Sequence, residues 1–178
     1  MSIPNKSLSI VSSIAFIALF AQLSIDVPLG QTMIPITGQT FAVLLVGYWL
    51  GTKWGMIAIV GYIALGIIGF PIFADAKSGW EVVIGGSGGY LIGFIVGAGI
   101  AGWFYNRKPI FVNALLAMMI GTLVILLFGV GRLAQLYGLE KGLDYGFYPF
   151  WQGAIVKIIL GTIAAWAVNK FSPNKNMK

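Results

Sequence analysis

The chain alternates between long runs that carry no charged residue and short segments where the charges gather. Five runs are uncharged and a sixth is interrupted only by Lys157; they span residues 7–25, 27–52, 54–74, 82–106, 109–131 and 145–169. A helix needs about 20 mainly apolar residues to cross the hydrocarbon core of a bilayer, so each run is long enough for one crossing. The pattern therefore predicts an all-α integral membrane protein with six transmembrane helices.

The charges divide unevenly between the two sides that six crossings would create. One side carries seven basic residues and no acidic residue: Lys6, Lys53, Arg107, Lys108, Lys170, Lys175 and Lys178. The other side carries three basic residues and all five acidic ones: Lys77, Arg132, Lys141, Asp26, Asp75, Glu81, Glu140 and Asp144. Because basic residues concentrate in cytoplasmic loops, we expect both termini in the cytoplasm and the protein in the inner or plasma membrane.

Composition narrows the possible functions. The 178 residues suffice for one domain, which we expect to span residues 1–178. With 58% hydrophobic and 9% charged residues, the chain has more apolar surface than a soluble domain of this size can bury. It contains no cysteine and no histidine, which excludes disulfides, thiolate chemistry and histidine-based catalysis. The net charge is +6, but the basic residues lie at predicted membrane edges, so we expect no nucleic-acid partner.

The segment after the first predicted helix is uncharged and yet unsuited to a helix. Two prolines and two glycines interrupt its first half: Pro28, Gly30, Pro35 and Gly38. Irregular backbone at membrane depth is tolerated only where it is buried in protein or lines a cavity. We therefore expect residues 31–39 to form a partly re-entrant outer loop, a lid or wall that presents Thr37 and Gln39 inward. An ordinary apolar surface loop is the alternative.

A glycine-rich segment, residues 85–90, precedes the fourth predicted crossing. Glycines let a backbone approach another group closely, and the free N–H groups at a helix start favour an anion or a carbonyl oxygen. No Gly-Lys-Ser/Thr follows, so the segment is not a phosphate-binding P-loop. Gly86, Ser87 and Tyr90 are candidate ligand contacts. The alternative is close helix packing, which small residues also mediate in lipid.

Lys157 is the one ionisable residue well inside a predicted crossing. A lysine at the bilayer centre costs about 2.5–3.5 kcal/mol, so it should face a cavity or a partner, and a carboxylate ligand would suit it. The alternative is that its ammonium reaches the outer interface along its own side chain. Gln152 lies five residues before it as a further polar candidate. Trp80 and Trp151 either anchor the outer membrane interface or stack on a flat ligand.

Five segments resemble, in order along the chain, those of the BioY family: residues 27–30, 34–47, 69–74, 85–94 and 148–153. The most specific are Pro-Ile-Thr-Gly-Gln-Thr at 35–40 and Ser-Gly-Gly-Tyr-Leu-Ile-Gly-Phe at 87–94. BioY proteins are the biotin-specific substrate-binding subunits, or S components, of energy-coupling-factor (ECF) transporters. The last helix departs from the family pattern Pro-Gly-Asp, because Ala154 replaces the aspartate while Lys157 keeps its place.

The resemblance implies high-affinity biotin uptake through a complex with a membrane coupling protein (EcfT-like) and two cytoplasmic ATPase subunits. Under this interpretation the chain is no enzyme, binds no cofactor or metal, and leaves ATP to its partners. The implied biotin site comprises Thr37, Gln39, Trp80, Gly86, Ser87, Tyr90, Trp151, Gln152 and Lys157. The alternatives are a subunit or solo transporter for another small carboxylate-bearing vitamin, and a membrane enzyme. An enzyme is disfavoured because no acidic pair, histidine or cysteine lies within a crossing.

Overall fold

The structure is a computed structural model that describes residues 3–29, 32–107 and 110–171. Its elements follow one another as α1 (Ile3–Gln22), β1 (Ser24–Leu29), β2 (Thr32–Thr37), α2 (Gln39–Ile67), η1 (Ala74–Ala76), α3 (Trp80–Ile84), α4 (Gly88–Arg107), α5 (Phe111–Tyr137), α6 (Leu139–Gly146) and α7 (Trp151–Phe171). Several residues used in the sequence analysis lie outside the described ranges: Gly30, Gln31, Lys108, Lys175 and Lys178.

Long apolar helices dominate the fold, which confirms the prediction of a helical membrane protein. Among the described residues α2, α4 and α5 are long and apolar enough to cross a bilayer. A fourth candidate is the pair α6 and α7, bent by 48° at the break between them, and residues 6–22 of α1 form a shorter apolar helix. Large apolar side chains such as Leu123 and Leu127 of α5 point outward, 55% and 62% exposed. Lipid can cover surface of this kind, whereas water cannot do so favourably.

The prediction that the fold is all-α is wrong for residues 24–37. β1 and β2 form an antiparallel hairpin with Ser24 opposite Thr37 and Leu29 opposite Thr32. At its base the N–H of Gly38 donates to the carbonyl of Leu23, 2.8 Å away. The prolines do exclude a helix here, but strand pairing satisfies the backbone groups that an irregular loop would leave open. Proline is tolerated because both strands of a two-stranded ribbon are edges.

The chain folds back on itself at Gly51, inside α2. Gly51 has φ 75° and ψ 171°, a left-handed conformation that favours glycine. The two arms of α2 then lie against each other, since a Cβ on Gly55 would be 2.8 Å from the Cα of Gly47. This bend lies beside Lys53, which separates two of the uncharged runs that the sequence predicts as crossings.

Glycines also bring α4 and α5 into close contact. A Cβ on Gly93 would lie 2.9 Å from the Cα of Ile125, and a Cβ on Gly97 would lie 3.0 Å from the Ile125 side chain. Ala101, one turn farther along α4, is fully buried. Close approach through small residues is the usual way in which helices pack in lipid.

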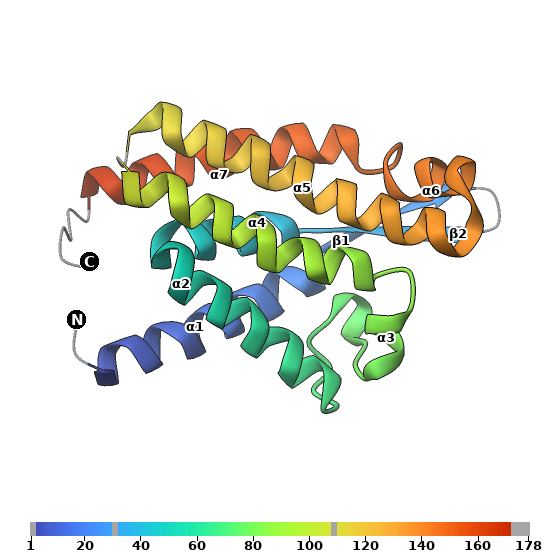
Figure 1. The fold of residues 1–178 in the computed structure, drawn as a ribbon, viewed down its shortest axis with the longest axis horizontal. Coiled ribbons are helices and arrows are strands. Elements are labelled where there is room, and N and C mark those ends of the chain that lie inside the picture. The colour runs from blue at the N-terminus through green and yellow to red at the C-terminus, as the bar shows by residue number, and fades with distance from the viewer. Residues whose placement is uncertain (1–2, 30–31, 108–109, 172–178) are drawn as a thin grey trace.

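Figure 1 shows that the helix ends are sorted between two ends of the molecule. α1 begins, α2 bends and α7 ends at one end, on the left in this view. The hairpin, α3 and α6 lie toward the opposite end. The hairpin and the short helices are therefore at the same end of the molecule, which we call the loop end.

Candidate functional site

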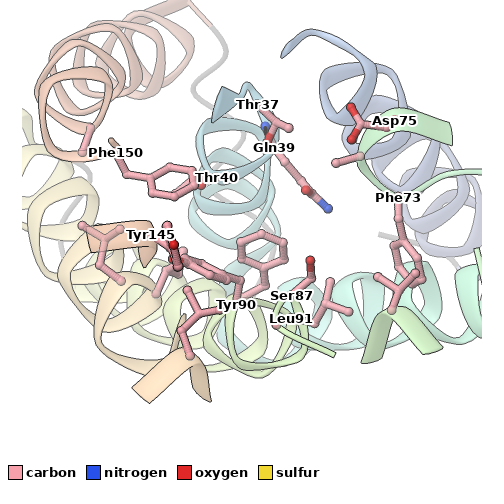
Figure 2. A pocket seen from close by; sticks show the side chains of 18 of the residues that line it. Thr37, Gln39, Thr40, Phe73, Asp75, Ser87, Tyr90, Leu91, Tyr145 and Phe150 are labelled. Atoms are coloured by element: carbon pink, nitrogen blue, oxygen red, sulfur yellow. Dashed lines mark hydrogen bonds between the residues drawn. The ribbon is translucent and has the colours of Figure 1, made fainter. Parts of the chain in front are cut away.

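A cavity of about 590 Å³ lies among the helices. Its lining comes from the hairpin, from segment 73–77, from the six helices α2 to α7 and from the connections before α4 and α7. The residues are Thr37, Gln39, Thr40, Phe73, Ala74, Asp75, Lys77, Val82, Gly86, Ser87, Tyr90, Leu91, Phe94, Thr122, Ile125, Leu126, Leu133, Tyr137, Lys141, Tyr145, Phe150, Ala154 and Lys157. Figure 2 shows side chains converging from opposite walls, with Gln39 on one side and Tyr90 and Tyr145 on another. A few polar groups among apolar walls are the usual composition of a small-molecule site.

Gln39 is the most buried polar residue at the start of α2, 6% exposed. Its Nε2 donates to the Tyr62 hydroxyl at 2.7 Å, and that hydroxyl donates to the carbonyl of Ile72 at 2.7 Å. The Gln39 backbone N–H donates to Thr37 Oγ1 at 3.3 Å. Thr37 and Gln39 both line the cavity, as predicted, although Thr37 ends a hairpin strand and Gln39 begins α2, in place of a re-entrant loop.

Segment 69–79 is fastened beside the cavity by Gln22 of α1 and by its own Phe73. Gln22 donates through Nε2 to the carbonyl of Phe73 and accepts through Oε1 from the N–H of Ala76, each at 2.9 Å. The Phe73 ring is 2% exposed and stands edge-on to the Tyr62 ring, with centroids 5.6 Å apart. Tyr62 therefore contacts this segment through both its ring and its hydroxyl.

Lys157 extends from α7 toward the hairpin. Its Nζ donates to the carbonyl of Thr37 at 2.8 Å, and the side chain is only partly exposed. Among the side chains that the structure describes, a set without Asp26, the one ion pair is Lys77 with Asp75, and none of these carboxylates pairs with Lys157. The Nζ reaches a protein carbonyl beside the cavity instead of the outer interface, which disfavours the alternative of a solvent-seeking lysine. An ammonium has three N–H donors, and one of them bonds to a group that the structure describes.

The glycine-rich segment contributes both to helix packing and to the cavity lining. Gly88 and Gly89 serve packing, because a Cβ would overlap the backbone of Val83 or of Phe128, respectively. Gly86 and Ser87 line the cavity, where ligand contact stays a prediction. The guanidinium of Arg132 donates to the carbonyls of Ile84 and Gly85 and so holds the start of this segment.

Tyr90 forms part of the wall opposite Gln39 (Figure 2). Its hydroxyl donates to the carbonyl of Gly146 at the end of α6, 2.8 Å away. Its ring lies 5.7 Å from that of Phe150 and against Gly129, where a Cβ would overlap it. Tyr90 thus ties α4 to α5 and to α6, and its aromatic surface is the part that lines the cavity.

Three predicted contacts are not among the lining residues. Trp80 and Trp151 are 58% and 43% exposed, and Gln152 is also exposed. Trp80 is two residues before Val82, and Gln152 is two residues before Ala154, both of which do line the cavity. Residues two apart on a helix do not face the same way, so these two side chains point elsewhere. Exposed tryptophans near a membrane edge fit the alternative of interface anchors.

The sequence analysis missed several lining residues, of which Thr122 is the most informative. Thr122 is 4% exposed, lines the cavity from the middle of α5, and makes no side-chain hydrogen bond with the described residues. It is the one polar residue between Asn113 and Arg132, and this isolation within an apolar run could have marked it as a site residue. Aromatic residues such as Tyr145 and Phe150 carried no comparable signal, because aromatic residues are common at membrane interfaces.

Comparison with known proteins gives consistent results. The sequence profile of the BioY family matches residues 4–174. The biotin transporter BioY of Thermotoga maritima is 36% identical over 147 residues, which covers 82% of this chain and 86% of the relative. The probable biotin transporter BioY of Pyrococcus horikoshii is 36% identical over 157 residues, covering 85% and 93%.

A crystal structure of the S-component for biotin from an ECF-type ABC transporter has a similar fold. The TM-score is 0.79, at 22% sequence identity, and the match covers 96% of this chain and 95% of the other. At that identity the likeness shows a shared fold.

Proposed function

The chain belongs to the BioY family, and on that premise we propose that it binds biotin with high affinity for uptake, as the S component of an ECF-type transporter. The cavity is the observation that carries this proposal. Its volume, about 590 Å³, is in the range that holds small-molecule ligands. The named relatives are transporters rather than enzymes, and the proposed role requires binding without catalysis.

The polar groups of the cavity suit the parts of biotin. Biotin has a carboxylate tail, an apolar sulfur-containing ring, and a ureido group with N–H donors and a carbonyl acceptor. Lys157 has unused N–H donors for the carboxylate. Phe94, Ile125 and Leu126 offer apolar surface for the ring, and Gln39 and Thr122 offer hydrogen bonds to the ureido group.

Ala154 lines the cavity at the position where the family pattern has an aspartate. A contact made by that carboxylate is therefore absent from this chain. We propose that Gln39 and Thr122, rather than the exposed Gln152, supply the acceptors that remain for ligand N–H groups.

We place the chain in the cell (inner or plasma) membrane with six crossings and both termini in the cytoplasm. Counting α1, the two arms of α2 on either side of Gly51, α4, α5 and α7 gives six apolar segments. The ends of α1 and α7 that are nearest the termini lie at the same end of the molecule, opposite the loop end (Figure 1). The basic residues Lys6, Lys53 and Arg107 belong to that end, as cytoplasmic loops favour.

The proposed partners are a membrane coupling protein and two cytoplasmic ATPase subunits. The sequence carries no nucleotide-binding motif, so ATP-driven uptake needs other subunits to bind and hydrolyse ATP. The similar crystal structure is described as a component of an ECF-type ABC transporter. Residues 1–178 then act as one substrate-binding domain with no cofactor of its own.

Co-purification tests this proposal. The protein is expressed in cells grown with biotin, purified in detergent without added ligand, and denatured so that bound small molecules can be identified by mass spectrometry. We expect biotin in an amount approaching one per chain. Another vitamin in its place would contradict the substrate while leaving the transporter fold unchallenged.

A further inference from the structure

Tyr62 does not line the cavity, yet it determines how Gln39 meets a ligand. The Tyr62 oxygen lies 2.7 Å from the carbonyl oxygen of Ile72 and 2.7 Å from the side-chain amide of Gln39. A phenol has a single hydrogen, and a carbonyl oxygen can only accept. The Tyr62 hydrogen must therefore point at Ile72, so Gln39 must donate to the phenol oxygen through its NH₂ group. Because the last acceptor is the Ile72 carbonyl oxygen, each of the two hydrogen bonds can have only one donor.

The oxygen of the Gln39 side-chain amide, Oε1, is left as an acceptor. Gln39 Oε1 receives no hydrogen bond from the described residues. Among those residues Trp49 Nε1 is the one enclosed side-chain nitrogen or oxygen without a partner, so Gln39 Oε1 is not enclosed. Gln39 is 6% exposed and lines the cavity, which makes the cavity the space that its oxygen meets.

We propose that Tyr62 is a positioning residue that fixes the polarity of the Gln39 amide, so that the cavity accepts a ligand N–H at this point and rejects a ligand acceptor. The inference rests on the proposed function for its ligand, because the N–H in question would belong to the ureido group of biotin. Without the Tyr62 hydroxyl the amide could rotate by half a turn and present its NH₂ group instead. In the parent protein, Tyr62 thus contributes to ligand specificity without contacting the ligand.

The Ile72 carbonyl completes the arrangement. Ile72 precedes Phe73, whose ring packs edge-on to Tyr62 and whose carbonyl Gln22 holds. The acceptor that orients the Tyr62 hydroxyl is thus itself held in place by α1. A chain of buried hydrogen bonds fixes donor and acceptor roles more firmly than a single hydrogen bond does, because each member determines whether the next one donates or accepts.

Isosteric analogues of biotin test the inference. In two carbamate analogues an oxygen replaces one or the other ureido N–H, so that a donor becomes an acceptor with little change in shape. The parent protein should bind biotin about ten- to hundredfold more tightly than at least one analogue, because an acceptor there would face Gln39 Oε1. In Tyr62→Phe that ratio should fall at least tenfold, and the same analogue should bind the variant more tightly than it binds the parent. Loss of structure could not produce this gain.

Two further variants separate the outcomes. In Gln39→Met the preference for biotin should already be lost, and adding Tyr62→Phe should not change the ratio again. Tyr105→Phe removes a phenol that packs on Tyr48, outside the cavity lining, and should leave the ratio as in the parent. If the parent binds biotin but Tyr62→Phe keeps its ratios within about twofold, Tyr62 does not orient Gln39. If the parent does not bind biotin at all, the proposed function fails, and this inference fails with it.

Discussion

Lys157 links two parts of the site through one side chain. One N–H of its ammonium is bonded to the Thr37 carbonyl at the end of the hairpin, and the others are open to a ligand. A carboxylate placed there would meet a cation that no described acidic residue neutralises. Charge-assisted hydrogen bonds in such surroundings are stronger than neutral ones.

Lys157→Ala should weaken biotin binding about ten- to hundredfold, which corresponds to the loss of about 1.5–3 kcal/mol. Biotin methyl ester, which has no carboxylate charge, should bind the parent and the variant alike. Calorimetric titration of both ligands against both proteins measures the four affinities. Lys53→Ala, at the opposite end of the molecule, serves as the matched control. If parent and variant discriminate acid from ester equally, the carboxylate does not meet Lys157.

Thr122 and Thr162 form a natural pair for testing a single hydroxyl. Both are nearly fully buried, but Thr162 Oγ1 donates to the carbonyl of Ile158 at 2.7 Å, whereas Thr122 faces the cavity. Thr122→Val should weaken biotin binding roughly five- to tenfold, since one neutral hydrogen bond contributes about 1 kcal/mol. Thr162→Val should leave the biotin affinity unchanged. Equal affinities for the parent and Thr122→Val would remove Thr122 from the site.

The sequence indicated which types of residue form the site better than it indicated which way their side chains point. Thr37, Gln39, Ser87, Tyr90 and Lys157 were chosen because polar groups are rare in an apolar chain, and all five line the cavity. Trp80 and Trp151, the candidates for stacking on a flat ligand, and the polar Gln152 are exposed. Their direction depends on how α3 and α7 are rotated, and contacts distant in the sequence determine that rotation.

At the scale of elements, the end of the hairpin at Thr37 and residues 73–77 contribute to the cavity wall. Only residues 24–27 of the first strand alternate polar and apolar positions, while the second strand has four consecutive apolar residues at 33–36, so periodicity does not predict the hairpin. In segment 69–79 no local sequence pattern predicts that Phe73 inserts into the core. The glycines were more informative, since the turn at Gly51 and the α4–α5 contact follow from their positions.

Gly66→Ala tests whether the Phe73 anchor supports binding. A Cβ at Gly66 would overlap the Phe73 ring, so the ring must move and segment 69–79 must shift with it. Overpacking of this kind costs about 1–3 kcal/mol, and we expect a lower melting temperature together with weaker biotin binding. Both are measured on the detergent-purified protein.

Gly131→Ala is the control for this substitution. Gly131 lies on α5, and a Cβ there would meet nothing within 4 Å. Alanine favours a helix more than glycine does, so the melting temperature should stay the same or rise. Should Gly66→Ala bind biotin as the parent does, the Phe73 anchor is dispensable for the site.

At the scale of the whole molecule, the account depends on which end faces the cytoplasm. Reporter fusions at residue 178 and at the turn near Arg107 should report the cytoplasm, and fusions near Lys77 and Lys141 should report the outside. The reason is the excess of basic residues at the end where α4 ends. An external signal at residue 178 would mean an odd number of crossings and would reverse part of the loop assignment.

The most direct test of the central claim is an equilibrium titration of the purified protein, without nucleotide or partner subunits, against biotin, thiamine and riboflavin. If the cavity is a biotin site, biotin should bind tightly and dissociate slowly, because the hairpin, segment 73–77 and six helices surround the ligand. Thiamine and riboflavin carry no carboxylate for Lys157 and should bind far more weakly. Equal affinity for all three vitamins, or no binding of biotin, would contradict the account.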